Sequence, residues 1–231
     1  MLKLIRASGL ASIQDLGRLG YLSQGVPVSG VLDSLSFRMA NMALGNPEGA
    51  ACIEFMGRFD WVCEQACVVM LASRHGRLTV NKREMPSGVS VLLQDGDIIQ
   101  VECQPNAPWG LLCLGGGVQV PLVLGSRSTC AVAGFGGYLG RTLRSGDVVC
   151  AGDSVPSAVS VPLSPKPRLA LPSSVGAEPQ ALRFIPGPDF DALSVTAQAE
   201  FTHQTYRVSS QASRMGYRLD GVSIQSSGLH S

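Results

Sequence analysis

Short apolar runs alternate with turn residues along the first two thirds of the chain. The runs are rich in Val, Ile and Leu, and Gly, Pro, Asp and Asn separate them. This pattern is typical of β-strands joined by tight turns. Asp95-Gly96, between two such runs, predicts a hairpin. The predicted strands cover residues 2–6, 52–56, 59–63, 67–72, 78–80, 89–93, 98–103 and 111–114.

Two segments have the period of a helix instead. Residues 34–44 carry an apolar stripe, with Asp33 or Ser34 as the N-cap and Gly45 as the stop signal. A second helix is predicted for residues 189–201, where apolar side chains recur every four positions. The sequence therefore predicts a mainly β protein with few short helices.

Proline and serine concentrate in one segment of the chain. This composition predicts a linker at residues 154–180. The linker would separate an N-terminal β-rich domain, residues 1–153, from the start of a second β-rich domain, residues 181–231. The segment after residue 180 is too short to bury a core of its own. We therefore expect the second domain to be incomplete.

Composition narrows the class of protein. Charged residues make up 15% of the 231 residues and the net charge is +1. So low a charge favours a surface that other protein chains cover, and it argues against nucleic acid as a partner. The apolar runs are too short to cross a membrane or to form a signal peptide, so we expect a cytoplasmic protein. The seven cysteines are interpreted as reduced core thiols rather than as a metal or redox site.

Common catalytic motifs are missing from the sequence. It has no phosphate-binding G-x-x-x-x-G-K-[ST] loop, no G-x-S-x-G nucleophile elbow and no H-E-x-x-H pair. The three histidines lie in no recognisable catalytic context. An enzyme built on this chain would use carboxylates, arginines and backbone amides, and we expect no metal site.

The most informative candidate residues lie in a glycine-rich stretch near the N-terminus. Asp15 and Arg18 are three positions apart, which allows either a ligand site or an ion pair that fixes the loop. Ser29 and Asp33 precede the first predicted helix. Asp33 is interpreted as the helix N-cap, and an anion at the same helix terminus is the alternative.

Two further segments combine arginine with glycine. Ser126 and Arg127 lie in a loop of small residues that suits a phosphate or carboxylate, or equally a turn closed by its own hydroxyls. Arg214 and Arg218 would share one face of a strand around Gly216, as an anion site or as a solvated surface.

Several motifs occur in a characteristic order. They are IQDLGRLGY (13–21), GVPVSGVLD (25–33), ANMALGNP (40–47), GGGV (115–118), LGSRST (124–129), GRTLRSGD (140–147), IPGP (185–188) and SRMGYRL (213–219). Together they resemble the carboxyltransferase-like family that includes the C subunit of 5-oxoprolinase, allophanate hydrolase subunit 2 and part of urea carboxylase. The resemblance covers essentially the whole chain.

This resemblance implies a fold of cyclophilin-like β-barrel domains and an ATP-dependent activity on a lactam or amide. The chain would be the C subunit of a 5-oxoprolinase that converts pyroglutamate to glutamate together with A and B subunits, and it would be inactive alone. A biotin-dependent carboxyltransferase domain, with biotin on a partner chain, is the first alternative. A regulator that antagonises a kinase inhibitor is the second.

The resemblance also implies functional roles for the candidate residues. Asp15, Arg18 and Tyr217 are then expected to be catalytic. The N-terminal loop and the segment 214–218 are expected to form one site for an anionic ligand. Substrate- or anion-binding roles are expected for Ser29, Asp33, Ser126, Arg127, Arg214 and Arg218.

Overall fold

The computed structural model describes residues 1–103, 109–152, 183–209, 214 and 216–224. The chain divides into two compact units, Met1–Ser173 and Ser174–Ser231. The predicted linker, residues 154–180, lies outside the described residues. Its extended character therefore stays a prediction.

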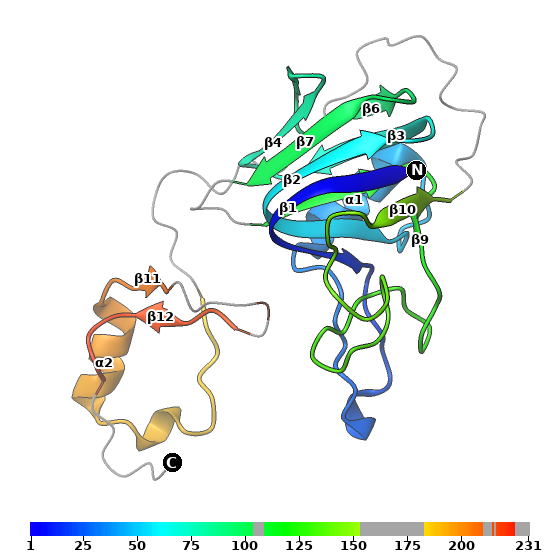
Figure 1. Cartoon of the computed structure of the whole chain (residues 1–231). Helices are drawn as coiled ribbons and strands as arrows, with labels where there is room; N and C mark the ends of the chain where they lie inside the picture. The colour runs from blue at the N-terminus through cyan, green and yellow to red at the C-terminus, as the bar shows by residue number, and fades with distance from the viewer. Residues whose placement is uncertain (104–108, 153–182, 210–213, 215, 225–231) are drawn as a thin grey trace. The chain divides into compact units, whose positions relative to one another are not determined.

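The first unit is built on a 10-stranded antiparallel sheet (Figure 1). A 3-10 turn, η1 (Leu22–Gln24), and one helix, α1 (Ser34–Leu44), lie between the first two strands. The strands are β1 (Leu2–Gln14), β2 (Cys52–Cys63), β3 (Cys67–Ala72), β4 (Gly76–Val80), β5 (Arg83–Met85), β6 (Ser90–Leu93), β7 (Ile98–Cys103), β8 (Trp109–Leu114), β9 (Val118–Gln119) and β10 (Val148–Ala151).

The long strands β1 and β2 form the spine of this sheet. They pair along their whole length, and the free edge of β2 is shared by β8 on residues 53–56 and by β7 on residues 58–62. The sheet therefore branches at Gly57, which faces Gly9 across the pair. Both glycines have positive φ, and a Cβ on Gly9 would lie 2.0 Å from the carbonyl oxygen of Met56. Only glycine fits this branch point.

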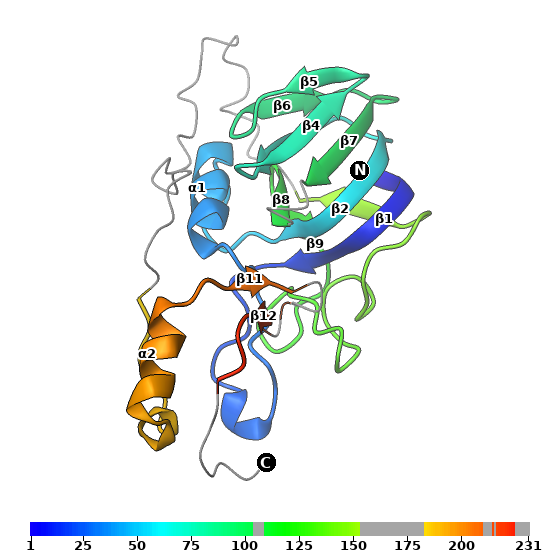
Figure 2. The same ribbon diagram turned by 90° about the vertical axis from the view of Figure 1, so that its left-hand side faces the viewer.

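The packing of the core explains why the sequence predicts two strands, 52–56 and 59–63, where the structure has the single strand β2. In its second half, buried Phe59, Trp61 and Cys63 alternate with partly exposed residues, because one face packs on the main core. In its first half both faces are buried: Ile53 joins the main core, while Cys52 lies in a second cluster with residues of α1. Helix α1 contacts β3 and β8 (Figure 2).

The mainly β class is confirmed, and the structure corrects the details. The first strand runs to Gln14 instead of residue 6, and β5, β9 and β10 were not predicted. Among the described strands the sheet stays open, with β5 and β9 at the ends of its main path. The hairpin predicted at Asp95-Gly96 is wrong. It is a turn between β6, which pairs with β3, and β7, which pairs with β2 and β4.

The second unit is small in its described part. It contains η2 (Phe190–Ala192), α2 (Val195–His203), β11 (Arg207–Val208) and β12 (Leu219–Asp220), with the two strands paired. The helix predicted for 189–201 is interrupted, because the Ser194 hydroxyl accepts a hydrogen bond from the Ala197 amide and starts α2 there. No helix in the described ranges is both long enough and apolar enough to span a bilayer.

Candidate functional site

Two loops far apart in the sequence meet beside β1. One follows β1 and covers residues 15–33, and the other joins β9 to β10 over residues 120–147; both views show them side by side below the sheet (Figures 1 and 2). The amides of Thr129 and Leu143 each donate to a β1 carbonyl over 2.8 Å, to Ile13 and Ala11. These bonds fix the second loop along the strand that delivers Asp15.

Asp15 is the centre of the polar cluster between these loops. Its Oδ1 accepts hydrogen bonds from the Gly17 amide at 2.8 Å and from the Ser126 and Ser128 hydroxyls at 2.6 Å each. Its Oδ2 accepts from the Arg127 amide at 2.5 Å. Burial alone raises the pKa of Asp15, but these four donors outweigh it and leave the pKa below its ordinary value. Asp15 is therefore a carboxylate held as an anion by the fold.

The backbone amides of residues 126–129 are all engaged within the fold. The amide of Arg127 serves Asp15, and those of Ser126, Ser128 and Thr129 are also bonded within the fold. The Ser126 side chain is fully buried against Asp15. The anion that this loop holds is internal, so its described donors do not fit an ATP phosphate. We derive no step through ATP at this loop.

Arg18 joins the same two loops by a different set of contacts. It is 1% exposed, and its guanidinium donates to the carbonyls of Val123 and Ser128 and, over 3.2 Å, to the Ser29 hydroxyl. The Phe135 ring lies against it, 4.8 Å from centroid to Cζ. No carboxylate forms an ion pair with Arg18 among the described residues. The Asp15–Arg18 ion pair suggested by the sequence is therefore absent there, and both side chains bind Ser128 instead.

The structure thus brings five of the predicted site residues together: Asp15, Arg18, Ser29, Ser126 and Arg127. We call these, with Ser128, the Asp15 cluster. Whether any of them binds a ligand stays a prediction. Arg127 is the partly exposed cation of the cluster, and its side chain donates to the Val120 carbonyl at 3.1 Å and the Gln119 amide oxygen at 3.4 Å.

Sequence reasoning missed three polar groups that support these loops. Ser128 was passed over although it alternates with Ser126 in the motif. Gln14 accepts a hydrogen bond from the Gly30 amide at 3.0 Å, and Glu54, 1% exposed on β2, accepts one from the Leu32 amide at 2.7 Å. The available signal for Glu54 was a lone charge inside an apolar strand run.

Asp33 lies outside the Asp15 cluster. Its carboxylate accepts from the Ser36 amide at 2.9 Å and the Ser36 hydroxyl at 2.5 Å, which is N-cap geometry. The cap reading is confirmed. The alternative of an external anion at this helix terminus is not supported, since the Asp33 carboxylate occupies it.

The remaining predicted site residues belong to the second unit. Arg214, Tyr217 and Arg218 were expected on one strand, but β12 begins only at Leu219. That local prediction is wrong. Tyr217 is half exposed, and the Arg218 carbonyl accepts from the Ser209 amide at 2.8 Å. A site shared between these residues and the N-terminal loop stays a prediction.

Comparison with known proteins places the chain. The family model described as "Carboxyltransferase domain, subdomain A and B" matches residues 24–231. The chain belongs to this family. It is 29% identical to the 5-oxoprolinase C subunit of Escherichia coli K12 over 96% of this chain and 69% of that protein.

Longer proteins contain a similar segment. The chain is 30% identical to the urea amidolyase of Lachancea kluyveri over 91% of its own length and 12% of that protein. Its fold matches the crystal structure of Kluyveromyces lactis urea carboxylase with a TM-score of 0.79 and 29% identity, covering 95% of this chain and 20% of that one. This carboxyltransferase-family domain therefore occurs both in single subunits and inside large multidomain chains.

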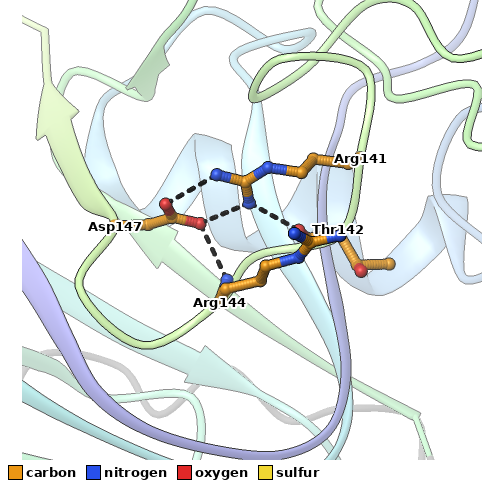
Figure 3. A network of polar contacts seen from close by, with 4 residues as sticks. All are labelled: Arg141, Thr142, Arg144 and Asp147. Carbon is orange, nitrogen blue, oxygen red and sulfur yellow. Dashed lines mark hydrogen bonds and ion pairs between the residues drawn. The ribbon is translucent and has the colours of Figure 1, made fainter.

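The family motif 140–147 has a structural role in this domain. Both oxygens of Asp147 accept from the Arg141 guanidinium, at 2.7 and 2.8 Å, and one also accepts from the Arg144 amide at 2.7 Å (Figure 3). The hydrogen bonds from Arg141 keep the pKa of Asp147 below its ordinary value. The Asp147 carbonyl in turn accepts from the Leu4 amide. This ion pair therefore fixes the entry to β10.

Two other motifs of the carboxyltransferase-family domain meet at a cavity of about 440 Å³. Asn46, after α1, accepts from the Gly116 amide at 2.7 Å and donates to the Leu114 carbonyl at 2.8 Å, which ties the helix to the β8–β9 turn. The Asn46 amide is thus fully engaged in the cavity wall. The lining residues are Gly45, Asn46, Pro47, Gly116, Gln119, Ala151 and Gly152.

In the described part of the domain, the cysteines are mostly buried thiols. Five are buried, and the sulfur atoms of Cys63 and Cys67 are 4.0 Å apart. Burial raises the pKa of Cys67 to about 12, so its thiolate is disfavoured at neutral pH. Within the described ranges no group of His, Cys, Asp and Glu is arranged to hold a metal ion.

Proposed function

We propose that this chain is the C subunit of an ATP-dependent 5-oxoprolinase that works with A-like and B-like partner proteins. The observation that supports this proposal is the extent of the similarity. It runs over 96% of the chain and 69% of the 5-oxoprolinase C subunit, whereas the similar segment is 12% of urea amidolyase. The aligned region therefore includes most of the C subunit and only a small part of urea amidolyase.

The chemistry of lactam opening explains why a protein of this kind would need partners. A lactam carbonyl is a poor electrophile. Transfer of the γ-phosphoryl group of ATP to the lactam oxygen, with release of ADP, would activate it, after which water would open the ring and release phosphate. The Arg127 amide and the Ser126 and Ser128 hydroxyls are engaged with Asp15 and are not available to a phosphate. We therefore assign ATP binding to a partner protein.

Within this chain we assign substrate binding to Arg127. Its backbone is fixed by Asp15, and its partly exposed side chain is oriented by the Val120 carbonyl and Gln119. A guanidinium held in this way suits the carboxylate of 5-oxoproline. Arg18 is assigned a positioning role, since its buried guanidinium holds the two loops together.

The test is a reconstitution. The chain is purified alone and together with A-like and B-like proteins from the same genome, and phosphate release that depends on 5-oxoproline is measured. We expect turnover only from the assembled complex, and Arg127→Met should raise KM by the tenfold or more that loss of a charged contact brings. Robust turnover by the isolated chain, or none by the complex, would overturn the proposal.

A carboxyltransferase domain of the urea carboxylase type is the second candidate. The structural similarity to urea carboxylase, with a TM-score of 0.79, favours it. In that case turnover would require urea, bicarbonate and ATP, and avidin would abolish it by capturing biotin on a partner chain. Assays with 5-oxoproline and with urea, each with and without avidin, separate the two candidates. The non-enzymatic alternative predicts binding to a kinase inhibitor and no turnover in either assay.

A further inference from the structure

Large apolar side chains protrude from the two loops that enclose the Asp15 cluster. They are exposed by 41 to 83%, although charged or small residues would cost less in such positions. We call this set the loop face. It consists of Leu19, Leu122, Leu124, Val132 and Leu139.

The contacts of Arg18 connect the backbone segments that carry four of these residues. Leu19 is its neighbour in sequence, and its Nε contacts the carbonyl of Val123, which lies between Leu122 and Leu124. The ring that packs on Arg18 is that of Phe135, whose backbone closes the turn from residue 130 that carries Val132. The loops that carry the loop face are therefore joined by the hydrogen bonds of the buried Arg18 side chain.

The backbone beneath the loop face is strained at two of its members. Leu124 and Leu139 have φ values of 52° and 55°, in the left-handed region that leucine rarely adopts. Strained backbone is retained where the local geometry serves a function. Here both strained residues are also exposed, so exposure of apolar surface and backbone strain occur at the same positions.

The exposed charges of these two loops are mostly positive. Of the carboxylates, Asp15 is buried, Asp147 is paired with an arginine of its own loop, and Asp33 is exposed but engaged as the cap of α1. Arg127 is partly exposed and Arg144 is exposed. A complementary surface would be apolar at its centre with carboxylates at its edge.

We propose that the loop face is the docking surface for one of the partner proteins, which covers it with an apolar segment flanked by Asp or Glu. This inference rests on the proposed function, because it assumes that the chain works within an assembly. A second copy of this chain is disfavoured, since the exposed arginines would face one another.

The test uses substitutions that remove the leucines and relieve the strain. Asparagine tolerates the left-handed conformation, so Leu124→Asn and Leu139→Asn should melt at the wild-type temperature or above it. In the double variant the affinity for the A-like and B-like proteins, measured by titration calorimetry, should fall at least tenfold. Leu92→Asn is the control: Leu92 is 53% exposed on β6, which both views place away from these loops. It should leave the affinity within twofold.

The outcomes separate the docking proposal from the proposed function. If the wild type turns over 5-oxoproline with its partners and the double variant assembles as tightly, the docking proposal is wrong and the function stands. If assembly depends on the loop face but no 5-oxoproline is consumed, the docking stands and the function is wrong. If the wild type forms no complex with either partner, both are overturned.

Discussion

Asp15 offers the most direct test of how the candidate site is held together. Asp15→Asn keeps the size of the side chain but replaces one carboxylate oxygen with an NH₂ group. With its remaining oxygen placed toward Gly17, Ser126 and Ser128, the NH₂ group must face the Arg127 amide, which is also a donor. The substitution therefore loses a charge-assisted hydrogen bond and leaves a buried amide without an acceptor.

The two losses can be estimated separately. A hydrogen bond to a charged group contributes about 1.5–3 kcal/mol, and an unsatisfied buried donor costs about 1–3 kcal/mol. Together they predict a loss of about 2.5–6 kcal/mol, a large share of the roughly 5–15 kcal/mol by which a domain is stable. For a unit of this size the melting temperature should fall by about 5–24 °C.

Tryptophan fluorescence during urea unfolding measures this loss in the first unit alone. Both tryptophans of the chain, Trp61 and Trp109, belong to that unit. The control is Asp95→Asn, an exposed turn aspartate that should change the free energy of unfolding by less than about 0.5 kcal/mol. If Asp15→Asn were as mild as this control, Asp15 would not be the centre of the network.

The same residue predicts how stability depends on pH. The pKa of Asp15 lies below the ordinary value of 3.8, so the unfolded chain binds its proton more readily than the folded one. Its contribution is complete above that ordinary value and is lost as the pH falls through the lower folded pKa. Asp147 has a lowered pKa as well. Asp15→Asn should therefore reduce, without abolishing, the acid loss of stability below about pH 4.

Three further substitutions test the scaffold around the site. Gly9→Ala should unfold the first unit or destabilise it by several kcal/mol, because the added Cβ would lie 2.0 Å from a carbonyl oxygen of the paired strand. Gly49→Ala is the control: the Cβ added there meets only ordinary contacts, so the melting temperature should change little. Arg141→Lys should cost about 1 kcal/mol in urea unfolding, since lysine cannot bind both oxygens of Asp147; equal stability would show that the paired geometry is unimportant. Asp33→Ala should cost about 1 kcal/mol through loss of the helix cap, and Asp33→Ser should restore most of it.

Local signals account for most of the fold that could be predicted. The strands that pack on the core alternate or form apolar runs, and α1 carries both a cap and a glycine stop, so their ends were found closely. The sequence did not predict the extension of β1 from residue 6 to Gln14. Apolar and polar residues do not clearly alternate in that half of the strand, and its pairing with β2 specifies it. The turn at Asp95-Gly96 was misassigned for the same reason. A turn sequence indicates a reversal of the chain, while the pairing of its flanking strands depends on distant segments.

For the candidate site, too, the sequence located the loops but not their contacts with distant residues. Glycine and charge in residues 13–33 and 124–129 marked the two loops correctly, since such residues are placed where the backbone must approach another group closely. Composition could not show that the group approached is Asp15 itself. A loop of hydroxyls and free amides has the same sequence whether it receives a ligand phosphate or a carboxylate of its own chain.

The internal carboxylate changes what the neighbouring arginines can do. Because Asp15 binds the Arg127 amide and the Ser126 and Ser128 hydroxyls, neither guanidinium has to neutralise it. The Arg18 guanidinium donates to the Ser128 and Val123 carbonyls instead, and that of Arg127 donates to Val120 and Gln119. Arg18 bonds to backbone carbonyls without a carboxylate among the described residues, which fixes geometry and leaves the cluster with uncompensated positive charge. Arg127 carries part of that charge toward the surface. In the proposed function, Arg127 would bind the anion of a substrate, and the exposed leucines of the loop face would contact a partner. Arg127→Met and the double leucine variant test these two roles independently.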